Sequence, residues 1–301
     1  MKSIRLGLRE YSQWYLFLLI PFVGTIVFNL YPLVQTMIQS LCNAQDVFIG
    51  FANFKAMFSD KSFIKALNNT LYMGVLGILM NIPVAFLVAY LLHSITKCRR
   101  LFQSIYLLPM VISFVALANL FRLIFAPEPN SLANLFLGLF GAQPLTWFND
   151  IFIVRPLVVF MAVWKGIGFN IIILYAGLQA IPVSHYEAAE IEGVTEWQRV
   201  RYITLPGIRN TMIVVWITTW MAVFKRFTDV FALGREYAQP AEYTLTLMFY
   251  IYQKSFSQLF AKEEGIAAAA SVVLFVLILL VTAFNYFVTE DRDSLRGERN
   301  D

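Results

Sequence analysis

Residues 153–178 read IVRPLVVFMAVWKGIGFNIIILYAGL, an apolar run with only two charged residues, Arg155 and Lys165. About 20 apolar residues suffice for a helix to cross the ~30 Å hydrocarbon layer of a membrane. The chain contains five more runs of this kind. The sequence therefore predicts an all-α, polytopic integral membrane protein, a single transmembrane domain over residues 1–301, with six transmembrane helices. The predicted spans are 14–38, 67–92, 101–125, 153–178, 211–233 and 265–289.

The overall composition supports a membrane protein and argues against a nucleic-acid partner. Of the 301 residues, 59% are hydrophobic and 14% are charged, whereas soluble domains carry about 25% charged residues. The net charge is +4, but Lys and Arg occur in short clusters between the apolar runs, as topology signals do. The lipid bilayer is therefore an expected partner, and nucleic acid is not.

The basic residues also predict the orientation in the membrane. With the N-terminus inside, twelve Lys and Arg residues are cytoplasmic and seven are external. Because basic residues concentrate in cytoplasmic loops, both termini and the loop 181–206 are expected in the cytoplasm. Cys42 and Cys98 then lie on opposite sides of the membrane, which excludes a disulfide between them.

Smaller sequence patterns predict local features of the spans and external loops. Pro83 and Pro109 predict kinks in the second and third spans. Phe51, Phe54 and Phe58 recur at helical spacing, which predicts a short amphipathic helix on the outer membrane face. The external segment 126–150 is expected to lack a regular element.

The loop 181–206 reads IPVSHYEAAEIEGVTEWQRVRYITLP and predicts two short helices. Ser184 with Glu187, and Thr195 with Gln198, have the spacing of capping boxes at the start of each helix. Gly193 is expected at the C-terminal cap of the first helix. The two alanines after Glu187 leave one helix face flat, so another protein surface can approach it closely.

The spacing in this loop resembles the EAA motif of ABC importer permeases. The motif is Glu-Ala-Ala, three residues, Gly, nine residues, Ile, one residue and Leu-Pro, and every position matches. The resemblance implies a coupling helix that docks on an ATP-binding subunit, with Glu187 pairing with a basic group there and Gly193 permitting the turn. A simple helix cap and helix stop would explain the residue types but not the complete spacing. The implied ATPase-coupling residues are Glu187, Ala188, Ala189, Gly193, Ile203, Leu205 and Pro206.

The rest of the chain resembles maltose-type carbohydrate permeases, and most of all the first of their two permease subunits. The matching features are GFANF at 50–54, WKGIGFN at 164–170 and the six-span layout. The segment 233–240 departs from this family, which often has a Gly-rich, Pro-containing run there.

This wider resemblance implies a subunit of a bacterial plasma (inner) membrane importer that moves a sugar or oligosaccharide by alternating access. The implied partners are a second homologous permease, two ATP-binding subunits and an extracytoplasmic substrate-binding protein. This chain is then not an enzyme and has no cofactor of its own, because ATP and Mg bind to the partner subunits.

The same resemblance implies a substrate pathway between spans four and five. Its expected residues are Gly166, Phe169, Asn170, Thr219, Ala222, Val223 and Arg226. Helix packing is the alternative role for Phe169 and Thr219. Because a guanidinium prefers carboxylate or phosphate partners, Arg226 raises the hypothesis of an anionic saccharide of the uronate type. A pair between Arg226 and Asp229, three residues apart, is the simpler alternative.

Three other cations, Arg122, Lys165 and Lys225, lie within or at the edge of predicted spans, where a charge is costly. Arg122 is close to the outer edge of its span, which favours a side chain that reaches the lipid headgroups. Lys165 is deeper, and it either lines a pathway or pairs with an acid.

Other chemistry has little support in the sequence. There is no phosphate-binding Gly-x-x-x-x-Gly-Lys-Ser/Thr loop, and His93 and His185 lack the partners of a metal site. ABC import of a phosphorylated polyol or another solute remains an alternative. An ion-coupled secondary carrier is a second alternative, although it should show intramembrane carboxylates or repeats.

Overall fold

The computed structural model describes residues 12–95, 99–234, 243–256 and 263–297. This described part is almost entirely helical and contains no strand beyond an isolated bridge between Cys42 and Phe48. Its contacts divide the chain into unit 1, Met1–Asp60 with Ile251–Val273, and unit 2, Lys61–Tyr250 with Leu274–Asp301. The all-α prediction is confirmed. The prediction of one permease domain over 1–301 is untested and stays a prediction.

The first predicted span forms a continuous helical stretch in unit 1. It consists of α2 (Ser12–Thr25), the π-helical turn η1 (Ile26–Leu30) and α3 (Tyr31–Gln39). Within it, Phe17–Gln39 is long and apolar enough to cross a membrane, and none of its most apolar window is buried. Apolar side chains that are exposed in this way suit a lipid environment.

The predicted amphipathic helix is present in unit 1 as α4 (Ala52–Ser59). Phe51, just before this helix, and Phe58, within it, are exposed, whereas Met57 is fully buried. The Asn53 amide nitrogen donates to the carbonyls of Ser40 and Cys42, 3.0 and 2.8 Å away, and so ties α4 to the end of α3. Cys42 is a buried free thiol, and Cys98 lies outside the described residues.

A charged cluster in unit 1 joins the start of α17 (Glu264–Gly297) to α16 (Leu247–Phe256), a helix that the sequence did not predict. Lys254 Nζ lies 3.3 Å from an Asp60 carboxylate oxygen and 2.5 Å from one of Glu263. Burial lowers the pKa of the Lys254 ammonium, but the hydrogen bond and charge of Glu263 and the charge of Asp60 outweigh it. The pKa therefore lies above its ordinary value.

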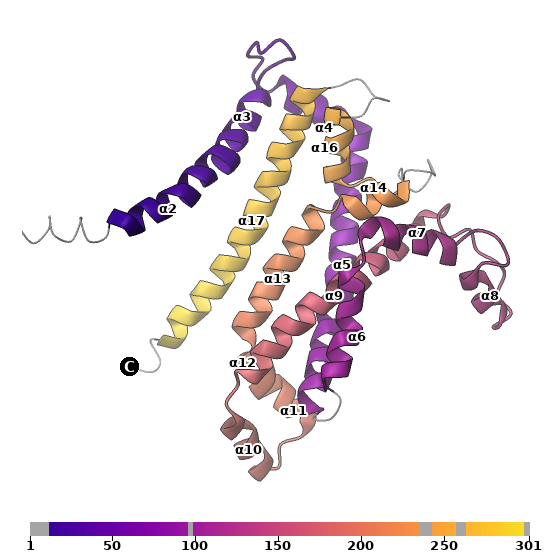
Figure 1. Ribbon diagram of the computed structural model, residues 1–301, viewed down its shortest axis with the longest axis vertical. Coiled ribbons are helices and arrows are strands. Elements are labelled where there is room, and N and C mark those ends of the chain that lie inside the picture. Colours follow the sequence, from indigo (N-terminus) through magenta and orange to yellow (C-terminus); the bar gives the residue numbers. More distant parts are fainter. Residues whose placement is uncertain (1–11, 96–98, 235–242, 257–262, 298–301) are drawn as a thin grey trace, which may run out of the picture. The chain divides into compact units, whose positions relative to one another are not determined.

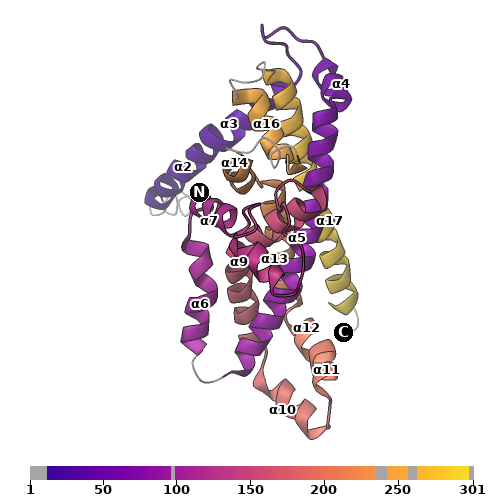
Figure 2. The same ribbon diagram turned by 90° about the vertical axis from the view of Figure 1, so that its right-hand side faces the viewer.

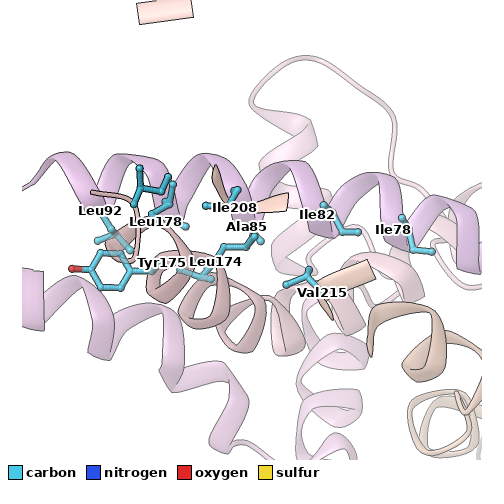
Figure 3. Close-up of a cluster of buried hydrophobic side chains, with 12 residues drawn as sticks. Ile78, Ile82, Ala85, Leu92, Leu174, Tyr175, Leu178, Ile208 and Val215 are labelled. Carbon is cyan, nitrogen blue, oxygen red and sulfur yellow. The ribbon is translucent and has the colours of Figure 1, made fainter. Parts of the chain in front are cut away.

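The core of unit 2 is built on two long helices, α5 (Lys61–Ser94) and α9 (Ile151–Gln179), which share the most extensive helix contact. Figure 3 shows side chains of α5, including Ile78 and Ile82, in one buried cluster with Leu174 and Leu178 of α9. A third helix, α13 (Arg209–Phe224), adds Val215 to this cluster. Helix α5 continues through Pro83 without interruption.

Glycines allow the helices of unit 2 to approach closely. A Cβ on Gly74 of α5 would lie 2.6 Å from Val223 Cγ1 of α13, and a Cβ on Gly177 of α9 would lie 2.5 Å from Thr211 Oγ1. A Cβ on Gly168 would lie 2.6 Å from the backbone oxygen of Tyr106, on α6 (Arg99–Val111). Such small-residue contacts are the usual way in which membrane helices pack.

Two of the predicted spans are broken. Helix α6 ends at Val111, and α7 (Phe114–Ile124) continues at an angle of 95°. The change of direction between α6 and α7 can be followed on the right-hand side of Figure 1. The expected kink at Pro109 is therefore wrong in position: Pro109 lies inside α6, and the break falls at Ile112 and Ser113, where the Ser113 side chain caps α7. The fifth span ends early, because α13 stops at Phe224 and α14 (Thr228–Gly234) begins after a gap.

The remaining elements include one further helix that the sequence did not predict. Helix α8 (Leu132–Gly138) lies within the segment expected to be irregular, and Ser131 caps its start. In the described part, four helices are long and apolar enough to cross a membrane, and two bent helix pairs raise the number to six. That range includes the six predicted spans.

Gly168 and Gly166 give a matched test of the close contact between α6 and α9. Gly168→Ala should lower the melting temperature of the purified protein, because its Cβ meets the Tyr106 oxygen and overpacking costs about 1–3 kcal/mol. Gly166→Ala is the control, since nothing lies within 4 Å of its Cβ position. Both substitutions bring the same gain in helix propensity, so equal melting temperatures would contradict the contact.

Candidate functional site

A cavity of about 390 Å³ lies within unit 2, between α5, α7, α9, α13 and the segment after α13. The seven residues expected in a substrate pathway all line it: Gly166, Phe169, Asn170, Thr219, Ala222, Val223 and Arg226. The structure therefore brings these residues together. Their role in contacting a substrate stays a prediction.

A polar network joins three helices at the wall of this cavity. The Asn170 amide nitrogen of α9 donates to Asn81 Oδ1 of α5 at 2.6 Å and lies 3.1 Å from Thr219 Oγ1 of α13. Asn81 and Asn170 are both buried. Sequence analysis missed Asn81 as a site residue, although an amide in an apolar span is a signal that it needs a polar partner.

Arg226 does not share a helix with the other expected pathway residues of span five. Thr219, Ala222 and Val223 belong to α13, but Arg226 lies beyond the end of that helix, in the gap before α14. The pairing with Asp229 is present: Arg226 Nε is 3.2 Å from Asp229 Oδ2, and both side chains are nearly buried. One guanidinium nitrogen, Nη1, is buried without a hydrogen-bond partner. The pair therefore uses only part of the hydrogen-bonding capacity of Arg226.

The cavity lining combines aromatic rings with polar groups. The aromatic rings in the lining are those of Phe114, Phe169 and Phe227, and eight further residues contribute amides, hydroxyls or charged groups. The polar lining residues are Asn81, Asn170, Thr218, Thr219, Lys225, Arg226, Thr228 and Asp229. Apolar walls with a few polar groups are the usual make-up of small-molecule sites. Sugars suit such a lining, because they present apolar C–H faces and hydroxyls.

Neither role expected for Lys165 is seen among the described residues. It is not among the residues that line the cavity, and its contacts with the described residues do not include an acid. The ammonium donates to the carbonyl of Met110, 2.9 Å away, and to the carbonyl of Ile112. These carbonyls lie where α6 breaks, so Lys165 caps the freed end of that helix.

Arg122 also differs from its expected role. Its guanidinium donates to the carbonyls of Ala232, at 2.9 Å, and Leu233. Both carbonyls belong to the last turn of α14, so Arg122 of α7 caps α14 and does not simply extend to lipid headgroups.

Arg155 and Asn69 hold the irregular segment before α16. Arg155 Nε donates to the Tyr243 carbonyl at 3.1 Å, and its Nη2 donates to Asn69 Oδ1 at 2.5 Å. The Asn69 amide nitrogen in turn donates to the Leu245 carbonyl at 3.0 Å. These contacts were not predicted, because they join positions far apart in the sequence.

The loop 181–206 forms two short helices at one end of unit 2, at the bottom of Figures 1 and 2. Helix α10 (Val183–Ile191) is followed by Gly193, which has φ +67°. The Gly193 amide donates to the Glu190 carbonyl, and the Val194 amide donates to the Ala189 carbonyl, both at 3.1 Å. This is a Schellman motif, which needs a left-handed residue and so favours glycine. The prediction that Gly193 ends the first helix is confirmed, and its coupling role stays a prediction.

The two predicted capping boxes have different outcomes. Thr195 and Gln198 form a complete box at the start of α11 (Glu196–Arg199). The box of Ser184 and Glu187 is wrong, because α10 begins at Val183 after Pro182, and no side chain caps it. With Pro182 before it, Ser184 lies inside the first helical turn.

Five of the seven residues expected to couple to an ATPase line a groove of about 850 Å³ between α10 and the following turn η2 (Val200–Thr204). Ala188, Ala189, Gly193, Ile203 and Pro206 line this groove. Glu187 and Leu205 are exposed but do not line it. Tyr90 Oη of α5 donates to Glu196 Oε2 of α11 at 2.9 Å, which ties the loop to a helix whose Asn81 lines the cavity.

Comparisons with known proteins give a consistent result. A family described as "Binding-protein-dependent transport system inner membrane component" matches residues 81–292. The arabinooligosaccharides transport system permease protein AraP of Bacillus subtilis is 34% identical over 283 residues, or 92% of this chain and 88% of that protein. The lactose transport system permease protein LacF of Rhizobium radiobacter is 31% identical, over 88% of this chain and 90% of that protein.

One solved structure is similar over nearly the whole chain. It is a crystal structure of a bacterial ABC transporter involved in the import of the acidic polysaccharide alginate. The TM-score is 0.85 at 25% identity, and the match covers 96% of this chain and 99% of that one.

The cap at Gly193 leads to a test by amide hydrogen exchange. Gly193→Val should speed exchange of the Val194 amide by roughly tenfold, since a left-handed conformation costs about 1–2 kcal/mol in an L-residue. Gly193→Asn is the matched control, because Asn tolerates that conformation better. If exchange at Val194 is the same in all three proteins, the Schellman motif does not hold the loop.

Proposed function

Because this chain belongs to the family of binding-protein-dependent transport system inner membrane components, we propose that it forms half of a transmembrane pathway for a sugar or oligosaccharide. A second, homologous permease subunit supplies the other half. Transport proceeds by alternating access, and the cavity in unit 2 is this chain's part of the pathway.

The single observation that carries this proposal is the cavity with its mixed lining. Seven residues expected in a pathway on sequence grounds converge on one space, together with three aromatic rings and a buried amide network. The arabinooligosaccharide and lactose permeases, at 34% and 31% identity, support a saccharide as the transported solute.

Two ATP-binding subunits supply the energy in this proposal, and ATP and Mg bind to them and not to this chain. Helices α10 and α11 lie on the cytoplasmic side of the membrane, as do both termini of the chain. Helix α10 docks on one ATP-binding subunit. Closure of the ATPase dimer moves this loop and opens the pathway outward. A substrate-binding protein docked on the outside then releases its sugar, and hydrolysis resets the inward-facing state.

Anionic saccharides are the substrate class that Arg226 favours. Its Nη1 is buried at the cavity without a hydrogen-bond partner, and a charge-assisted hydrogen bond to a carboxylate would satisfy it. The similar structure of an alginate importer supports this choice. A phosphorylated polyol would offer a comparable anionic group, so it remains the second candidate.

The coupling role of the loop is tested by charge reversal in the complete reconstituted complex. Glu187→Lys should reduce ATP-dependent uptake by more than about tenfold, because reversing a charge in an interfacial ion pair costs about 2–5 kcal/mol. Uptake is measured in proteoliposomes with the binding protein, and co-purification of the ATP-binding subunits is measured alongside it.

The control for this experiment is Glu128→Lys, an equal charge change at an exposed position outside the loop. It should leave uptake unchanged. ATP-dependent uptake by the Glu187→Lys complex at the native rate would contradict the coupling assignment, and uptake driven by an imposed ion gradient without ATP would favour a secondary carrier.

The anionic substrate is tested by removing both charges of the Arg226 pair at once. Arg226→Gln alone would leave Asp229 buried and unpaired, at a cost of about 3–5 kcal/mol. The double variant Arg226→Gln/Asp229→Asn avoids this. Its uptake of an alginate pentasaccharide should fall by at least about tenfold, since a hydrogen bond to a charged group contributes about 1.5–3 kcal/mol.

Arabinotriose and glycerol 3-phosphate serve as comparison substrates, each measured at a saturating concentration of loaded binding protein. Uptake of neutral arabinotriose should stay within about twofold of native in the double variant. Unchanged uptake of the pentasaccharide would rule out the carboxylate contact. Uptake of glycerol 3-phosphate alone by the native complex would favour the phosphorylated polyol.

A further inference from the structure

Lys165 lies in the middle of α9, where the sequence alone did not explain it. Its ammonium donates to the carbonyls of Met110 and Ile112, at the break where α6 ends and α7 turns away by 95°. The last carbonyls of a helix have no partner within the helix. A bilayer offers no water to satisfy them, so a cation at this end of the dipole stabilises the break.

The same ammonium also contacts the first residue of α7. Lys165 Nζ lies 4.9 Å from the centroid of the Phe114 ring, a cation–π distance. Phe114 lines the cavity, whereas Lys165 does not. The lysine is therefore outside the cavity lining, and it contacts both the end of one helix and the aromatic ring that begins the next.

Lys165 is not the only contact that holds α6 on α9. Gly168, almost one turn further along α9, lets the α6 backbone approach so closely that a Cβ there would lie 2.6 Å from the Tyr106 oxygen. The position of α6 thus has support that does not depend on Lys165. What Lys165 adds is specific to the break and to the ring beyond it.

We propose that Lys165 is a positioning residue for the transported saccharide: by capping the broken third span it fixes the Phe114 ring as an apolar platform for a sugar ring in the cavity. This inference rests on the proposed function. A pyranose or furanose ring presents a C–H face that packs on an aromatic ring, while its hydroxyls can exchange hydrogen bonds with amides such as Asn170. Lys165 acts through Phe114 and does not touch the sugar.

The test measures sugar binding to the complete complex without the binding protein, whose own affinity would otherwise dominate the result. The ATP-binding subunits carry a substitution that prevents hydrolysis, and tritiated arabinotriose, lactose and alginate pentasaccharide are the probes. Phe114→Ala and Lys165→Met should each raise the Kd of the probes that bind by roughly tenfold, which corresponds to about 1.4 kcal/mol. Phe114→Tyr and Lys165→Arg, which keep the ring and the donors, should stay within about twofold.

A double variant separates positioning from a general structural effect. If Lys165 acts through the ring, Phe114→Ala/Lys165→Met should bind no more weakly than the weaker single variant. Additive losses, or native affinity in Phe114→Ala, would overturn the proposal. If the complex with Lys165→Met does not assemble, Lys165→Gln is used instead. Because Gln keeps a hydrogen-bond donor, this variant should give a Kd between those of the native and Phe114→Ala complexes. Native affinity in Lys165→Gln would also overturn the proposal.

The outcomes also distinguish this inference from the proposed function. A native complex that neither binds nor takes up any of the three saccharides would refute the proposed function. A native complex that binds and takes up one of them, with the same Kd in Phe114→Ala, would refute only the role of the platform.

Discussion

A membrane protein that breaks its helices must satisfy the freed backbone groups itself, because hydrocarbon cannot. Three cations meet this need in unit 2. Lys165 caps α6 at its break, Arg122 caps the end of α14, and Arg155 holds the irregular backbone at Tyr243. Each would be costly as an isolated charge in a membrane. Their hydrogen bonds to carbonyls offset that cost, so the breaks and the cations stabilise one another.

These breaks give the cavity much of its lining. Unbroken helices supply one side: α5 and α9 run through unit 2 and share its most extensive helix contact. The broken spans supply the other, because Phe114 follows the first break and Arg226 lies within the second. A continuous fifth helix would have placed Arg226 and Asp229 one turn apart on a regular face. The gap instead brings both residues to the cavity.

The sequence predicted those features that depend on local patterns. Apolar runs predicted the spans, and the spacing of Gly193 and Thr195 predicted the turn in the loop 181–206. The seven cavity-lining residues came from the resemblance to maltose-type permeases. Contacts between distant segments could not be predicted in this way. Nothing near Lys165 or Arg122 in sequence shows that their partners are carbonyls on other helices.

The break at Ile112 was missed because Pro109 was the stronger local signal, yet a helix can contain a proline where neighbouring contacts support it. The predicted box at Ser184 failed because Pro182 allowed the helix to start earlier.

The polar groups of the cavity are largely satisfied by one another, which matters for a pathway. The Asn170 amide nitrogen already contacts Asn81 and Thr219, and Arg226 already pairs with Asp229. A substrate must compete with these contacts, so each new hydrogen bond contributes less than it would to an unpaired group. A site that held its sugar tightly would release it slowly, and transport requires release. Weak, partly satisfied polar groups beside aromatic rings suit passage, while the separate binding protein in the proposed complex supplies affinity. Two buried atoms depart from this arrangement, because Arg226 Nη1 and Asp229 Oδ2 have no hydrogen-bond partner. The proposed anionic sugar would satisfy the first of them through one contact, without creating a trap.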